Sequence, residues 1–192
     1  GKIISPKDLK IKQKINIGLI GSGKIAEEYA KVIKSFNHNI VILISESKNK
    51  NALALAKKYK SNLYSNISDA EAKFDKIDAW IVCTHWQKLE KYLKYFLNTN
   101  KTVLIEKSIS INSTKIKNLI KNSKNNKKIS IAYNRNYYDY MPFLINKIKN
   151  NKLNYIDINL NDQYTSIIKS KGKQIKKKLS YYITSHWISL IL

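Results

Sequence analysis

The segment GSGKIA, Gly21 to Ala26, has the residue types and the spacing of a phosphate-binding turn. It follows the apolar run NIGLI and precedes a stretch with helical periodicity, so it predicts a turn between a strand and a helix. Gly21 permits a tight turn, Gly23 lets backbone amides approach a pyrophosphate, and the N-terminus of the helix adds partial positive charge. A glycine turn without a ligand is the alternative interpretation. The residues that we expect to contact a dinucleotide here are Gly21, Ser22, Gly23, Lys24 and Ile25.

An acidic residue stands where such a turn needs one. Glu46 lies 23 positions after Gly23, close to the spacing of about 20 residues at which a carboxylate binds the adenosine ribose. Its charge would repel a 2′-phosphate, which favours NAD over NADP as the cofactor. Ser47 and Lys48 beside it could soften that preference, and a solvated loop glutamate is the alternative. We expect both Glu46 and Ser47 to lie in the cofactor site.

The elements that must position these residues alternate between short apolar runs and amphipathic stretches. This alternation predicts an α/β fold, a doubly wound parallel sheet with helices on both faces. The strands are expected at Ile15–Ile20, Ile40–Ile44, Ala79–Cys83, Thr102–Ile105 and Ile129–Tyr133, with a short one near Leu63.

Apolar residues at helical spacing predict the helices between these strands. In the first helix we expect Ile25, Tyr29, Val32, Ile33 and Phe36 to pack on the sheet, and Leu89, Tyr92, Leu93 and Phe96 form a similar stripe later in the chain. Ser68 and Glu71 have the spacing of a capping box for a short helix.

The composition is that of a globular protein with an unusually basic balance. The 192 residues carry a formal net charge of +23, almost entirely from lysine, with Arg135 as the one arginine. Because arginine is the residue that reads guanine edges, base-specific nucleic-acid binding is not expected. A nucleic-acid binder without sequence preference is the least favoured hypothesis, and a steep salt dependence would support it.

Other sequence features concern the setting of the protein. No apolar run approaches the roughly 20 residues of a membrane helix, so we expect a soluble, cytoplasmic protein without membrane partners. The single cysteine, Cys83, lies in the apolar run AWIVC and is expected to be a buried thiol. No metal site is predicted.

The chain resembles the glucose-fructose oxidoreductase and inositol dehydrogenase (Gfo/Idh/MocA) family from about Ile15 to its last residue. Besides GSGKIA, the motifs that carry the likeness are IDAWIVCT (77–84), VLIEKS (103–108), IAYNRN (131–136) and SHWISL (185–190). The resemblance implies an NAD(P)-dependent enzyme of carbohydrate metabolism that transfers hydride to or from the hydroxyl-bearing carbon of a sugar, cyclitol or nucleotide-sugar. It also implies that Cys83, Thr84, His85, Glu106 and Lys107 line the cofactor cleft.

The same resemblance implies the catalytic groups. Lys107 would hydrogen-bond the reacting hydroxyl, and His186 would take its proton, because histidine titrates near neutral pH. Tyr182 stands where the family commonly has an acidic residue and could itself donate a proton, while Ser108 and Ser189 replace the proline and the aspartate of the family motifs. A satisfied histidine on an apolar helix is the alternative for His186.

The resemblance also implies the domain organisation. We expect an N-terminal arm (1–14), an NAD(P)-binding Rossmann domain (15–137) and the beginning of an α+β substrate domain (138–192), which would contain a strand at Tyr155–Leu160. A full-length family member would continue with a sheet that covers the substrate and forms a homo-oligomer. The alternative to an enzyme is a truncated dinucleotide-binding module without turnover.

Overall fold

The computed structural model describes residues 13–74, 76–107, 109, 112–123, 128–150, 155, 157 and 165. Within these residues, six parallel strands form one sheet in the order β3-β2-β1-β4-β5-β6. The strands are β1 (Asn16–Ile20), β2 (Asn39–Ile44), β3 (Asn62–Tyr64), β4 (Ala79–Val82), β5 (Val103–Ile105) and β6 (Ile129–Ile131). Each predicted strand up to β6 is therefore confirmed, as is the doubly wound α/β class.

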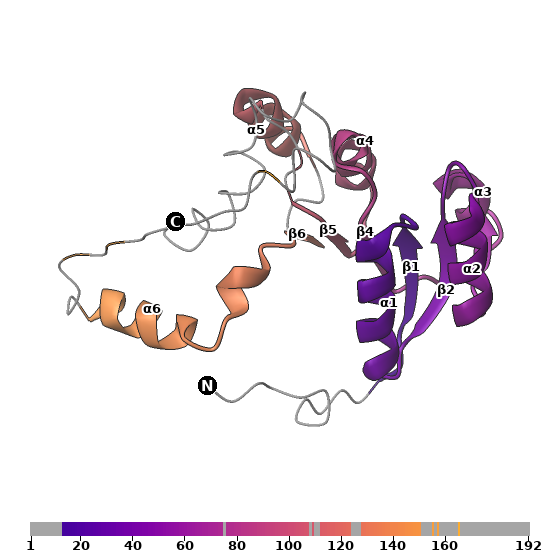
Figure 1. The fold of residues 1–192 in the computed structure, drawn as a ribbon. Coiled ribbons are helices and arrows are strands. Elements are labelled where there is room, and N and C mark those ends of the chain that lie inside the picture. Colours follow the sequence, from indigo (N-terminus) through magenta and orange to yellow (C-terminus); the bar gives the residue numbers. More distant parts are fainter. Residues whose placement is uncertain are drawn as a thin grey trace. The chain divides into compact units, whose positions relative to one another are not determined.

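Five helices connect these strands and cover both faces of the sheet (Figure 1). They are α1 (Lys24–Ser35), α2 (Lys50–Tyr59), α3 (Ile67–Glu71), α4 (Trp86–Leu97) and α5 (Ser113–Lys121). One apolar cluster joins the sheet to α1 and α2, and a second joins the other face to α3 and α4. The chain leaves β1 toward β2 on one side and later adds β4 on the other side of β1. This reversal of strand order is the topological position at which open α/β sheets bind ligands.

The face of α1 that packs on the sheet matches the predicted one only in part, since Ile33 is buried and Tyr29 is half-buried against the same apolar cluster. Its buried residues are Ala26, Ala30 and Ile33, whereas Ile25 and Val32 are 51% and 52% exposed. Two alanines, Ala26 and Ala30, fill the rest of this contact. The prediction for α4 was better: Leu89, Tyr92, Leu93 and Phe96 are all buried.

The start of α3 also departs from the sequence prediction. Asn66, and not Ser68, is the N-cap: its side-chain oxygen accepts a hydrogen bond from the backbone N–H of Asp69 at 2.8 Å. The Ser68–Glu71 capping box is therefore wrong by two residues. Glu71 instead accepts a hydrogen bond from the hydroxyl of Tyr95, at 2.8 Å, on the neighbouring helix α4.

The chain divides by its internal contacts after Ala132. The unit before this point holds the sheet. The unit after it contains a 3-10 helix, η2 (Asn134–Tyr137), and α6 (Met141–Lys149). Apart from Tyr155 and Asp157, the strand predicted at Tyr155–Leu160 lies outside the described residues, and the boundary at residue 137 remains a prediction.

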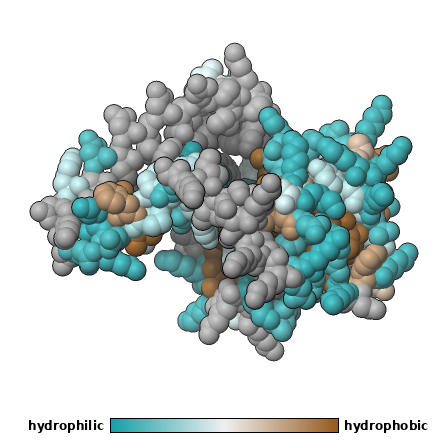
Figure 2. Space-filling model, turned by 90° about the horizontal axis from the view of Figure 1, so that it is seen from below, coloured by the Kyte–Doolittle hydropathy of each residue, from teal (hydrophilic) through white to brown (hydrophobic). Residues whose placement is uncertain are grey.

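Hydrophilic side chains cover most of the described surface in the view of Figure 2, with smaller hydrophobic areas between them. Among the described residues, no helix is both long enough and apolar enough to cross a bilayer.

Candidate functional site

The glycine turn joins β1 to α1 at the carboxyl end of the sheet. Gly21 has a φ of +125°, and a Cβ built there would lie 2.7 Å from the carbonyl oxygen of Cys83. Its N–H donates a hydrogen bond of 2.9 Å to the carbonyl of Ile44 at the end of β2. The turn thus fits between the ends of β2 and β4 only because residue 21 has no side chain.

Gly23 has a different role in the same turn. It is the N-cap of α1, it has an ordinary φ of −85°, and a Cβ built on it would meet no atom within 4 Å. No side chain caps the N-terminus of α1. The open space over Gly23 and the uncapped helix N-terminus together form a surface that suits an anionic group.

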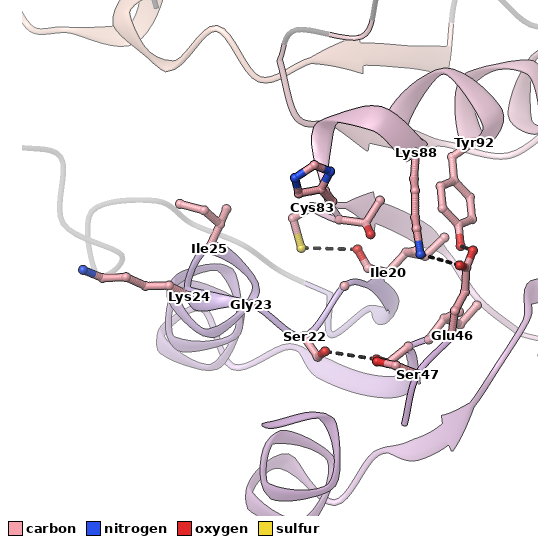
Figure 3. A pocket seen from close by; sticks show the side chains of 15 residues that line it. Ile20, Ser22, Gly23, Lys24, Ile25, Glu46, Ser47, Cys83, Lys88 and Tyr92 are labelled. Carbon is pink, nitrogen blue, oxygen red and sulfur yellow. Dashed lines mark hydrogen bonds and ion pairs between the residues drawn. The ribbon is translucent and has the colours of Figure 1, made fainter. Parts of the chain in front are cut away.

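A pocket of about 370 Å³ lies over this turn and the ends of β1, β2 and β4 (Figure 3). Its lining brings together ten of the residues that the sequence proposes for a cofactor site. These are Gly21, Ser22, Gly23, Lys24, Ile25, Glu46, Ser47, Cys83, Thr84 and His85. The exposed side chain of Ile25 borders the pocket instead of the core, which explains why it does not pack on the sheet.

Glu46 carries the main charged contacts of the pocket. Its Oε2 accepts a hydrogen bond from Lys88 Nζ at 2.5 Å, and its Oε1 accepts one from Lys91 Nζ at 3.1 Å. The Tyr92 hydroxyl donates to the same Oε1 at 3.4 Å. The hydrogen bond from Lys88 holds the pKa of the Glu46 carboxyl below its ordinary value, with Lys91 adding to the effect. Burial and the neighbouring carboxylate raise the pKa of Tyr92 to about 12.

The floor of the pocket is formed by the end of β4. Cys83 is buried, and its thiol lies 3.5 Å from the carbonyl oxygen of Ile20. Burial raises the pKa of this thiol, so the group is neutral near pH 7. His85 follows as the N-cap of α4, and its Nδ1 accepts a hydrogen bond from the backbone N–H of Gln87 at 3.5 Å.

Glu106 and Lys107 follow β5 and do not line this pocket. The backbone N–H of Glu106 donates to the Val82 carbonyl at 2.8 Å, and its Oε1 accepts a hydrogen bond from the Tyr29 hydroxyl at 2.6 Å. Tyr29 and Lys107 are both half-buried. Burial, followed by the contact with Glu106, raises the pKa of Tyr29. The loop that carries Lys107 is therefore anchored to α1, while Tyr182 and His186 lie outside the described residues.

Three polar residues of the site were not among the sequence predictions. Lys88 and Tyr92 reach the pocket from α4, and Ser45 forms a 3.0 Å hydrogen bond with the hydroxyl of Ser22. Ser45 is buried and directly precedes Glu46, so its position at the end of β2 was a usable signal. Lys88 had no such signal, because it lies 42 positions from Glu46 and looks like any exposed lysine on a helix.

A doubly wound parallel sheet with a glycine turn at its switch point defines the class of dinucleotide-binding α/β domains. The comparison with protein families is specific: residues 15–134 match the Gfo/Idh/MocA model, described as an oxidoreductase family with an NAD-binding Rossmann fold. The chain belongs to this family. The resemblance inferred from the motifs is thus confirmed, and NAD, the cofactor expected from the sequence, is the cofactor of the family's Rossmann fold.

Solved structures share the fold at low sequence identity. A myo-inositol dehydrogenase from Lactobacillus casei in complex with NAD(H) and myo-inositol has a TM-score of 0.64 and 19% identity, covering 72% of this chain and 42% of that one. A scyllo-inositol dehydrogenase from the same organism, with NAD(H) and scyllo-inositol, has a TM-score of 0.58 and 18% identity, covering 74% of this chain and 43% of that one. A myo-inositol 2-dehydrogenase from Lactobacillus plantarum has a TM-score of 0.61 and 19% identity, covering 75% of this chain and 43% of that one.

The chain thus spans less than half the length of each of these dehydrogenases. No curated protein matches it.

Proposed function

We propose that this chain supplies the NAD-binding part, and the lysine that contacts the substrate, of an oxidoreductase acting on the hydroxyl-bearing carbon of a sugar, cyclitol or nucleotide-sugar. The observation that carries the proposal is the pocket over the glycine turn, where an uncapped helix N-terminus and a strand-end carboxylate face the same space. The inositol dehydrogenases with this fold support a polyhydroxylated ring as the substrate class.

The residues present fit a dinucleotide. The open space over Gly23 can take a pyrophosphate, and the first-turn amides of α1 point donors at it. Glu46 offers acceptor oxygens for a ribose diol at the end of β2. Cys83, Thr84 and His85 would then lie along the path toward the nicotinamide half. When bound, the nicotinamide supplies the hydride donor or acceptor.

Lys107 is the residue of this chain that we assign to the reacting hydroxyl. It lies at the carboxyl end of β5, on the edge of the sheet where doubly wound folds bind their ligands. An ammonium group there would donate a hydrogen bond to the hydroxyl and stabilise negative charge as it develops on that oxygen. The hydrogen bond between Tyr29 and Glu106 supports this assignment, because it limits the movement of the loop. His186 remains the proposed base and Tyr182 a proposed proton donor.

The test is a comparison of Lys107→Ala with the unmodified form of the whole protein that contains this chain. Cofactor binding is measured by calorimetry with NAD, and hydride transfer is measured in single turnovers with a panel of cyclitols, sugars and nucleotide-sugars. We expect nearly unchanged NAD affinity and a rate lower by roughly 10²–10³, the usual effect of losing a hydrogen bond that strengthens in the transition state. Lys117→Ala, an exposed lysine of α5, is the matched control.

Two outcomes would contradict the proposal in different ways. Unchanged turnover in Lys107→Ala would overturn the role of this lysine. If the whole protein that contains this chain binds NAD and shows no hydride transfer with any member of the panel, the chain belongs instead to a dinucleotide-binding protein without turnover.

A further inference from the structure

The carboxylate that should select the cofactor is already occupied by cations. Both oxygens of Glu46 accept hydrogen bonds from α4, Oε2 from Lys88 and Oε1 from Lys91 and Tyr92. Figure 3 shows Lys88 and Tyr92 reaching from the helix toward the glutamate. A ribose diol needs two acceptor positions on this carboxylate, so it must share the oxygens with the lysines or displace them.

The net charge around Glu46 is not the negative charge that the sequence predicts at the end of β2. One carboxylate is paired with two ammonium groups, which leaves one positive charge in excess. An acidic residue at the end of β2 disfavours a 2′-phosphate by repulsion, and this repulsion is offset when cations lie within 3.1 Å of the same carboxylate. The two lysines therefore cancel much of the repulsion that Glu46 exerts on an incoming 2′-phosphate.

The two lysines are also able to move. Their side chains are 45% and 69% exposed, while that of Glu46 is 35% exposed. A lysine head on a flexible four-carbon stem can turn from the carboxylate to a phosphate oxygen a few ångströms away without any change in the helix. Tyr92, in contrast, is buried in the apolar cluster between the sheet and α4, and its hydroxyl donates to Oε1 of Glu46 from that fixed position.

We propose that Lys88 and Lys91 are specificity-determining residues, which neutralise Glu46 and bind the 2′-phosphate of NADP(H), so that the site accepts both dinucleotides with only a narrow preference for NAD(H). This inference rests on the proposed function, because it places the adenosine ribose beside Glu46. It goes beyond that function because it assigns the choice between NAD(H) and NADP(H) to residues of α4 and not to the loop after β2.

The test is the ratio of NADP to NAD dissociation constants, measured by calorimetry at about 0.15 M ionic strength. The fragments adenosine 2′,5′-bisphosphate and AMP are measured as well, since they probe the adenosine end without the nicotinamide half. In the unmodified chain we expect the two dinucleotides to bind within about tenfold of each other. In Lys88→Ala/Lys91→Ala we expect the ratio to rise by on the order of tenfold, with the loss in NADP and bisphosphate binding and not in NAD or AMP binding.

Lys34→Ala/Lys94→Ala is the matched control. It removes the same charge from exposed positions of α1 and α4 that form neither of the two ion pairs with Glu46, so it separates local contacts from the general field of the protein. Glu46→Gln is the converse variant, in which NADP should bind more tightly than NAD because the cations then have no carboxylate partner. Circular dichroism checks that each variant is folded.

The outcomes separate this inference from the proposed function. If the unmodified chain binds neither NAD nor AMP, the proposed function fails and the inference fails with it. If NAD binding is normal and the ratio is unchanged in Lys88→Ala/Lys91→Ala, or changes equally in the control, only the role of the two lysines is overturned.

Discussion

The two glycines of the turn differ in what their surroundings demand. Gly21 is required by the protein itself, since its positive φ and the backbone of Cys83 leave no room for a side chain. Gly23 is not required by any contact within the fold, because its φ is ordinary and its Cβ position is open. A glycine that the fold does not need is most simply explained by a ligand that approaches the backbone.

This difference predicts that the two glycines can be separated by experiment. Gly21→Ala should lower the free energy of unfolding by about 2–4 kcal/mol, because a strained φ and a backbone clash add together. Gly23→Val should lower the free energy of unfolding by no more than about 1 kcal/mol, because valine is a poorer N-cap than glycine. It should abolish NAD binding, since its side chain would fill the space for the pyrophosphate. Urea unfolding and calorimetry on both variants measure these effects. Normal NAD binding by Gly23→Val would contradict the assignment of the pyrophosphate site.

The site residues that could be predicted from the sequence are those that directly follow a strand. Glu46 and the glycine turn each directly follow an apolar strand, and strand ends of a parallel sheet meet at one edge. The contact between Glu46 and Lys88 could not be predicted in this way. It depends on the final position of the side chains of α4, and nothing in the spacing of lysines along a helix distinguishes the one that faces a carboxylate.

The helices owe their ends to local side-chain contacts, which are harder to predict than their apolar faces. The N-caps of α2, α3 and α5 are all asparagines, namely Asn49, Asn66 and Asn112. The chain is rich in asparagine and serine, so several neighbouring positions offer an equally plausible cap, and the choice of Ser68 for α3 was wrong for that reason. The strands were predicted well because both faces of the sheet are buried and continuous apolar runs are unambiguous.

The cap of α2 provides a test of these local contacts. Asn49 accepts a hydrogen bond of 3.0 Å from the N–H of Ala52, so Asn49→Ala should lower the free energy of unfolding by about 1 kcal/mol. Asn51→Ala, two residues later and exposed in the first turn, should be neutral or slightly stabilising because alanine has the higher helix propensity. Equal losses of stability in the two variants, measured by urea unfolding, would show that the cap contributes nothing specific.

The whole molecule carries a net charge of +23, and this charge affects every anionic ligand. We expect DNA to bind at low salt without sequence preference and to be released near physiological ionic strength, because lysines contact phosphates and a single arginine cannot read a sequence. Fluorescence anisotropy with two duplexes of unrelated sequence measures this over a range of salt concentrations. Retention of one duplex over the other at about 0.15 M ionic strength would contradict it.

The burial of Cys83, the one cysteine of the sequence, allows thiol labelling to measure how often this part of the fold opens. Cys83 is 6% exposed and its thiol is held neutral under the pocket, so a thiol reagent should react with it only in molecules whose β4 end has opened. The labelling rate, followed by mass spectrometry, should then report the population of opened molecules at one defined site. A dinucleotide bound over the same floor must leave before the thiol is reached. NAD at about 100 times its dissociation constant should therefore slow labelling by about 100-fold, and Gly23→Val should label at the same rate with and without NAD.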